Sequence, residues 1–520
     1  MGFTNTVSDF KINTNSDFLA KADAFKPDII KKNIYPERAV KIVKNNGDWA
    51  VVQAGTVAET EGCELGKNSS ICYDFGNHYV GYIDFDVNYS KNPSDAPLYL
   101  KIKLGEKPFE IGEESSDYHG VLGSGWIQEE YIHIDDLPAH IDFPRRYAFR
   151  YMQITVIDTS ASYKVNIQNV RCTSVTSADM SAVVKLKLKD ETLAAIDRVS
   201  VKTMLECMQD VFEDGPKRDR RLWVGDLRLQ ALVNYETFKN YDLVKRCLYL
   251  VAGLTQGKGR ISACVYAKRK SLPSEVNLFD YSLLYISCLY DYYKQTSDAD
   301  TVRDLLPTAK RQIELAAEKF DKRGIIRDSS EWWCFIDWND DLNKQASAQA
   351  IFIYCAKQYA ELAEAFGEDT ERVMQLIDMA ADAAKQYLWR EERGFFVSGD
   401  TKQISWASQI WFVLSGILSK EENAALLERL MKVNPQVGLK TPYAYHYFIQ
   451  ALFDSGMENY AVKCIKKYWG AMVDDGADCF YEIFNPENIS YSPYGSRVIN
   501  SYCHSWSGTP AYFIRKYLEK

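Results

Sequence analysis

The sequence predicts a two-domain chain in which an antiparallel β-sandwich is followed by an (α/α)6 barrel. Apolar residues recur with a period of two over roughly residues 35–175 and with a helical period from about residue 190 onward. The chain has 520 residues, which is long for a single hydrophobic core. We therefore expect a β-sandwich domain over residues 1–178 and a helical domain over residues 179–520.

The first half contains short alternating segments that are typical of half-buried strands. In LYLKIKL, residues 98–104, leucine and isoleucine alternate with tyrosine and lysine. Similar segments lie near residues 79–87, 126–134 and 149–157, and Gly, Pro, Asn and Asp clusters separate them. Many short strands between turn signals favour an antiparallel sandwich.

The second half contains a series of predicted helices, and about twelve is the number that an (α/α)6 barrel needs. The segments with helical periodicity lie near residues 190–211, 226–238, 241–254, 279–297, 300–320, 344–366, 368–389, 404–418, 420–432, 441–454, 456–470 and 504–518. Three long connections, 255–278, 321–343 and 471–503, interrupt the series. Long loops inside a compact domain usually carry function.

Composition restricts the partners and the location. The chain has 62 Lys and Arg against 71 Asp and Glu, a formal charge of -9 that disfavours nucleic acid. No apolar stretch resembles a secretory signal or a membrane span, so we expect a soluble, cytoplasmic protein with no membrane partner. The twelve cysteines are scattered without zinc-ligand spacing, which favours reduced, buried thiols and no metal site.

The most informative stretch is EDGPKRDRRLWVGD, residues 213–226. Gly215-Pro216 prevents a helix and the next helix is expected to begin near Asp226, so the stretch is a loop that leads into a helix. Its charged and aromatic residues are Glu213, Asp214, Lys217, Arg218, Asp219, Arg220, Arg221, Trp223 and Asp226. Taken alone, the pattern also fits a solvated, charge-paired loop in which Asp226 caps the helix.

The loop resembles the signature D-C-P-Q-R-(D/E)-E-R-L-G-W-T-G-D of the family 78 glycoside hydrolases, the α-L-rhamnosidases. The matching positions are Asp214, Arg218, Asp219, Trp223 and Asp226. Gly215 and Arg220 depart from the signature, the latter where a second acidic residue is usual, and one residue is missing before the tryptophan. If the acid of the family sits at the position of Arg220, the nearest carboxyl able to serve as proton donor here is Asp219, and another carboxylate of the loop, such as Asp214 or Asp226, stays open for that role. The resemblance implies the other four matching residues as substrate-binding.

Glycoside hydrolysis also needs a base or nucleophile on the other side of the sugar. The segment GADCFYEIFNPE, residues 476–487, resembles the family motif A-T-T-x-W-E-x-W, which implies Glu482 as the general base. The segment SYCHSWSGTPAYFI, residues 501–514, resembles the closing motif of the family and implies His504 as a sugar contact. Taken without the resemblance, Glu482 also fits the role of an ordinary surface carboxylate. His504 also fits the role of a capping residue at the start of a helix.

Aromatic side chains are expected at the same site, because pyranose rings stack on them while carboxylates and arginines bind the hydroxyls. The segment SEWWCFIDWNDD resembles the family loop with an aspartate-tryptophan pair. This resemblance implies Trp333, Asp337 and Trp338 as substrate-binding residues. Trp332 is expected in the core. Weaker candidates of the same kind are Phe279-Asp280-Tyr281 and the pair Trp406 and Gln409.

The resemblance covers about residues 40–520 and implies an inverting, exo-acting α-L-rhamnosidase without a cofactor, acting on small rhamnosylated glycosides or oligosaccharides. Asp219 and Glu482 are then expected roughly 6.5–9.5 Å apart. Arg218 and Arg220 are expected to point away from the Asp219 carboxyl or to bind other acidic partners, because a neighbouring cation lowers a carboxyl pKa.

Three alternatives stay open at this point. The same architecture fits another (α/α)6 hydrolase or a polysaccharide lyase, and the departure at Arg220 fits a non-catalytic sugar-binding protein. A homodimer is also open.

Overall fold

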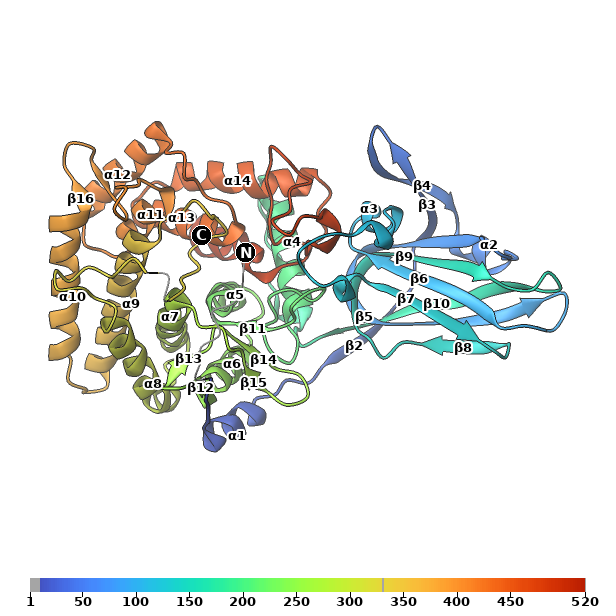
Figure 1. Cartoon of the computed structure of the whole chain (residues 1–520), viewed down its shortest axis with the longest axis horizontal. Coiled ribbons are helices and arrows are strands. Elements are labelled where there is room, and N and C mark those ends of the chain that lie inside the picture. The colour runs from blue at the N-terminus through green and yellow to red at the C-terminus, as the bar shows by residue number, and fades with distance from the viewer. Residues whose placement is uncertain (1–9, 330–331, 520) are drawn as a thin grey trace.

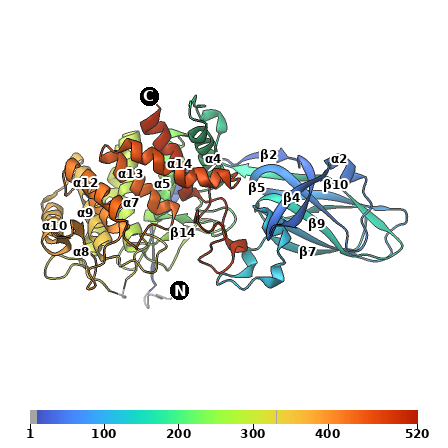
Figure 2. The same cartoon turned by 90° about the horizontal axis from the view of Figure 1, so that it is seen from above.

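The structure, a computed structural model, describes residues 10–329 and 332–519. A sheet domain and a helical domain lie end to end, with helix α4 (Glu191–Cys207) close to the junction (Figures 1 and 2). The predicted order of an antiparallel sheet domain and then a helical domain is confirmed. No helix within the described ranges is both long and apolar enough to cross a membrane.

The sheet domain is built from nine strands of the described chain, and all their pairings are antiparallel. The strands are β2 (Ile30–Ile34), β3 (Arg38–Asn45), β4 (Asp48–Gly55), β5 (Ser70–Ser90), β6 (Leu98–Gly105), β7 (Glu129–Ile134), β8 (Ala139–Asp142), β9 (Tyr147–Asp158) and β10 (Lys164–Thr176). The segments predicted near 79–87, 98–104, 126–134 and 149–157 correspond to β5, β6, β7 and β9. The apolar residues of these strands alternate because every second side chain faces the core, as Leu98, Leu100 and Ile102 of β6 show by being fully buried.

The nine strands form one hydrogen-bonded sheet because β5 takes part in both halves of it. Its first part pairs with β3 and β9, and its second part pairs with β8 and β10. The register with β9 shifts between Asp74 and Tyr79. Gly76 lies in this irregularity with φ +75°, and a Cβ there would lie 2.1 Å from the Glu37 carboxyl carbon. Glycine therefore permits the bend that carries β5 from one half to the other.

The helical domain contains, within the described residues, helices that alternate between an inner and an outer position. They are α4, α5 (Val224–Glu236), α6 (Tyr241–Gly253), α7 (Phe279–Thr296), α8 (Ala299–Ala317), α9 (Gln345–Ala365), α10 (Glu371–Ala383), α11 (Trp406–Leu414), α12 (Lys420–Val433), α13 (Pro442–Asp454), α14 (Glu458–Asp474) and α15 (Pro510–Phe513). Helices α5, α7, α9, α11 and α13 contact one another in succession, and α15 packs on α5. Residues 224–235 of α5 are all buried, whereas α10 buries one stripe, as expected for inner and outer helices.

The first described residues lie against the helical domain, although the sequence assigns residues 1–178 to the sandwich. Strand β1 (Ile12–Thr14) pairs with β12 (Leu254–Gln256), and helix α1 (Ser16–Ala24) packs on α6. The Arg246 guanidinium donates to the carbonyl of Ala22 at 2.6 Å. The chain then crosses to the sheet domain through β2 (Figure 1).

A buried ion pair joins the two domains beside the loop that follows α4. Arg146, at the start of β9, binds Glu213, and their side chains are only 3% and 2% exposed. Removing one partner of such a pair leaves a buried charge without its counterion, which is more costly than the loss of a surface pair.

We predict that Arg146→Ala lowers the free energy of unfolding by about 3–5 kcal/mol, because Glu213 is left buried without its main counterion. The matched control is Arg145→Ala, which removes a half-exposed contact with Glu130 and is expected to cost less than about 1 kcal/mol. Guanidinium denaturation followed by circular dichroism measures both. Equal midpoints for the two variants would contradict the assignment.

Candidate active site

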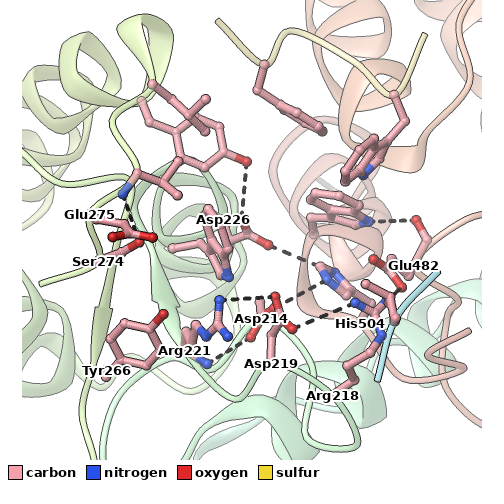
Figure 3. A pocket seen from close by; sticks show the side chains of 18 of the residues that line it. Asp214, Arg218, Asp219, Arg221, Asp226, Tyr266, Ser274, Glu275, Glu482 and His504 are labelled. Carbon is pink, nitrogen blue, oxygen red and sulfur yellow. Dashed lines mark hydrogen bonds and ion pairs between the residues drawn. The ribbon is translucent and has the colours of Figure 1, made fainter. Parts of the chain in front are cut away.

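A cavity of about 510 Å³ lies in the helical domain where its long loops meet. Residues from all three long loops that the sequence singled out line it, together with the loop between α4 and α5. Leu122 and Trp126 add a wall from the sheet domain, out of the connection between β6 and β7. Figure 3 shows the acidic and basic side chains gathered around this space.

Nine of the ten predicted site residues line the cavity: Asp214, Arg218, Asp219, Trp223, Asp226, Trp333, Trp338, Glu482 and His504. The tenth, Asp337, does not. Its buried carboxylate accepts hydrogen bonds from the backbone of Lys440 and Thr441 at 2.8 and 3.1 Å, and from the Thr441 hydroxyl at 2.7 Å. Asp337 therefore fixes its loop to the start of α13.

The loop between α4 and α5 is closed tightly by its own backbone. Asp219 and Arg220 have φ values of 66° and 54°, so two successive non-glycine residues occupy the left-handed region. The N–H of Arg220 donates to the carbonyl of Gly215, and the N–H of Arg221 donates to the Asp214 carboxylate at 2.9 Å. This strained turn directs Asp219 into the cavity, where its side chain is 22% exposed.

Two further carboxylates are buried next to Asp219. Burial raises the pKa of Asp214 well above its ordinary value, and the charges of Asp219 and Asp226 raise it further. Burial likewise raises the pKa of Asp226, whose Oδ1 atom has no hydrogen-bond partner among the described residues. Burial and the like charges nearby therefore both favour the protonated form of Asp214 and of Asp226.

The arginines of the loop are largely engaged elsewhere, as predicted. Arg220 donates to two backbone carbonyls at 2.7 Å, and Arg218 binds the carboxylate of Glu482. The guanidinium groups of Arg218 and Arg221 each remain 3.8 Å from one oxygen of Asp219. The sequence did not indicate the contact with Arg221. These two cations flank Asp219 at more than hydrogen-bonding distance.

Glu482 is held on both carboxylate oxygens. The Tyr494 hydroxyl donates to Oε1 at 2.6 Å, and Arg218 binds Oε2. Burial alone would raise the pKa of Glu482, but Arg218, His504 and the Tyr494 hydrogen bond together lower it below its ordinary value. The indole of Trp506 donates to the Glu482 carbonyl at 2.9 Å and fixes the backbone. Glu482 is therefore an ionised, immobilised carboxylate.

His504 lies between the buried carboxylates. Its Nε2 is 3.9 Å from Asp214, its Nδ1 is 3.9 Å from Asp226, and its ring stands 4.2 Å from that of Trp506. Burial lowers the pKa of His504 to about 4, so the ring is neutral at pH 7. A neutral imidazole offers one donor and one acceptor, which suits a sugar hydroxyl.

Aromatic rings form the apolar wall of the cavity. Phe335 and Trp506 stack at 5.8 Å, and Trp338 meets Phe335 edge-on at 5.4 Å. Trp223 meets Tyr281 edge-on at 6.3 Å, and the Tyr281 hydroxyl lies 3.4 Å from the carboxylate of Asp226. Such a surface matches the apolar face of a pyranose ring.

Several lining residues escaped the sequence analysis. Phe335 lies in the segment that resembles the family loop, and Tyr494 lies in a loop that only its length marked as functional; in neither did a periodic pattern indicate which side chains face inward. Trp506 lies inside the segment that resembles the closing family motif. Leu122 and Trp126 had no signal, because the sheet domain was expected to be accessory.

Two family models match the chain. One describes the N-terminal domain of glycosyl hydrolase family 78 α-rhamnosidases and matches residues 36–174. The other describes the six-hairpin glycosidase domain of bacterial α-L-rhamnosidases and matches residues 182–518. The chain belongs to glycosyl hydrolase family 78. It is thus a glycoside hydrolase, and the predicted resemblance is confirmed.

Solved structures resemble this family 78 hydrolase over most of its length. A rhamnosidase from Klebsiella oxytoca with rhamnose bound is 44% identical, with a TM-score of 0.95, and the match covers 97% of this chain and 99% of that one. A family 78 rhamnosidase of Bacillus sp. GL1 is 22% identical, with a TM-score of 0.71, and the match covers 86% and 46% of the two chains. At that lower identity the likeness shows the fold alone. A search of curated proteins found no match.

Proposed function

We propose that this family 78 hydrolase is an exo-acting α-L-rhamnosidase that works with inversion. One observation carries the proposal: Asp219, next to two buried carboxylates with raised pKa values, and the ionised Glu482 line the same aromatic cavity. The Klebsiella oxytoca protein, similar over nearly the whole chain, is a rhamnosidase with rhamnose bound, which supports the sugar. A cavity of about 510 Å³ has the size of a small-ligand pocket, which supports removal of a single terminal sugar.

Asp219 is the proposed general acid. It lines the cavity with its side chain 22% exposed, against 7% for Asp214 and 2% for Asp226. Of the three carboxylates it is the one best placed to reach the leaving oxygen. Asp214, Asp226 and His504 are the proposed partners of the sugar hydroxyls.

Glu482 is the proposed general base. Its lowered pKa keeps it ionised, and its two anchored oxygens favour a fixed base that activates water over a nucleophile that moves to the anomeric carbon. The remaining predicted residues, Arg218, Trp223, Trp333 and Trp338, are the proposed substrate contacts.

We also propose that the helical domain is an (α/α)6 barrel. The succession of contacts through α5, α7, α9, α11 and α13, with α15 packed on α5, supports this arrangement. In such a barrel the loops at one end of the inner helices form the active site, which fits the origin of the cavity-lining residues.

We predict that Asp219→Asn and Glu482→Gln each lower kcat on 4-nitrophenyl α-L-rhamnoside by a factor on the order of 10²–10⁴. For Asp219→Asn the loss should be larger with an alkyl rhamnoside, because a poor leaving group needs protonation more. Glu487→Gln, an exposed carboxylate of the same loop, is the matched control. An Asp219→Asn variant with equal losses on both substrates would exclude Asp219 as the acid.

Inversion predicts that the first rhamnose released has the anomeric configuration opposite to that of the substrate. Proton NMR during the first minutes of hydrolysis distinguishes the two anomers before mutarotation mixes them. Initial release of the α-anomer would show a retaining mechanism. It would then make Glu482 a candidate nucleophile.

We predict that Tyr494→Phe shifts the acidic limb of the pH–kcat/KM profile upward, by up to about one unit. The base must be deprotonated, and loss of the Tyr494 hydrogen bond destabilises the Glu482 carboxylate and raises its pKa. The basic limb should stay in place, because Tyr494 does not contact Asp219. Tyr491→Phe, in the same loop, is the control. An acidic limb that stays fixed or moves downward would contradict this role.

A further inference from the structure

A histidine and three cysteines meet in the interior close to the active-site loops. His78 comes from the bend of β5, Cys207 ends α4, and Cys479 and Cys503 lie in the chain between α14 and α15. All four side chains are buried, with His78 only 2% exposed and the cysteines no more than 1%. They come from distant parts of the sequence, so their spacing gives no metal-binding motif. From the sequence we expected only buried thiols at these positions.

Three of the donor atoms are close enough to share one ion, and the sulfur of Cys207 lies next to one of them. Ligand atoms of His78, Cys479 and Cys503 all lie within 4.8 Å of one another. The sulfur of Cys207 is 3.9 Å from that of Cys503. Two thiolates bound tetrahedrally to Zn²⁺ at about 2.3 Å lie about 3.8 Å apart, so this sulfur separation fits a common ion.

The histidine is oriented as metal-binding histidines usually are. Its Nε2 contacts the carboxylate of Glu106 at 2.9 Å, and Nδ1 is buried without a hydrogen-bond partner among the described residues. Glu106 is itself fixed by the backbone N–H of Tyr502 at 2.8 Å and lies 3.5 Å from the ammonium group of Lys217. A carboxylate on one ring nitrogen sets the tautomer and leaves the other nitrogen for a metal. An unpartnered buried nitrogen is otherwise costly.

We propose that His78, Cys207, Cys479 and Cys503 form a structural metal site, for which Zn²⁺ is the best match. Three thiolates and one imidazole are a recurrent donor set for structural zinc, whereas Mg²⁺ and Ca²⁺ prefer oxygen. On binding, the thiols release their protons to solvent and the sulfur atoms become thiolate ligands. With four protein ligands the ion has no open position for substrate, so its role is to hold segments together.

The segments that it holds carry the active site. Cys503 directly precedes His504, Cys479 lies three residues before Glu482, and the sulfur of Cys207 is 3.9 Å from the Asp214 carbonyl. Through the shared ion, His78 links the segments that carry these three cysteines to the sheet domain. The consequence for activity depends on the proposed function, but metal binding itself does not and is measured separately.

The experiment measures metal in the full-length protein, produced in zinc-supplemented medium and purified under reducing conditions. Mass spectrometry of the metal should find one zinc ion per chain. Protein produced with Co²⁺ should show thiolate-to-cobalt charge-transfer bands and the visible bands of tetrahedral cobalt. Both signals should be lost in Cys503→Ala and in His78→Ala, and retained in Cys247→Ala, which removes a buried cysteine of α6 outside the cluster.

Measurements on the wild-type protein alone also test for the metal site, so the result does not depend on whether a variant folds. A mercurial reagent should release zinc in step with thiol modification, as followed with a chromogenic chelator. Zinc and cobalt at the level of the buffer blank, with twelve titratable thiols after denaturation, would overturn the proposal. A shortfall of two thiols, which would indicate a disulfide within the cluster, would overturn it as well.

Discussion

The buried ion pair between Arg218 and Glu482 is the contact on which the arrangement of the active site depends. It joins two loops that are 264 residues apart in the chain. By binding Glu482 it stabilises the ionised base, and it engages a cation that would otherwise neutralise Asp219. A buried pair is stable only when other hydrogen bonds complete it. The Ile499 carbonyl on the arginine and the Tyr494 hydroxyl on the glutamate do so.

The sheet domain takes part in the active site and is more than an appendage. Its β6–β7 connection contributes Leu122 and Trp126 to the cavity, and the N–H of Val121 donates to the Tyr494 carbonyl at 2.9 Å. Lys217, next to Arg218, binds Glu110 of the sheet domain at 2.9 Å in a fully buried contact. Residues that lack secondary structure around Glu482 are therefore kept in place from outside the helical domain.

Periodicity was sufficient to predict the order of the domains and most elements, because burial imposes a period of two on strands and 3.6 on helices. It could not place β1 and α1, which are too short to show a period and take their position from contacts far along the chain. The motifs pointed to Asp219, Glu482 and His504, which line the same cavity. They did not reveal that Asp337 turns toward Thr441 while its neighbour Trp338 faces the cavity, since in an irregular segment adjacent side chains follow no fixed rule. Asp226 lies within the first turn of α5 instead of capping it.

Strand β1 pairs with β12, which is synthesised much later, and this has a consequence for the order in which the domains can fold. Asn13 contacts Thr255, 242 residues further along, so the first described strand has no partner until α6, the third α-helix after the sheet domain, has been made. The sheet domain, whose pairings lie within residues 30–176, completes its own contacts much earlier. Glu482 and His504 come near the end of the chain. During synthesis the strands of the sheet domain can therefore pair long before the cavity that contains Glu482 and His504 is complete.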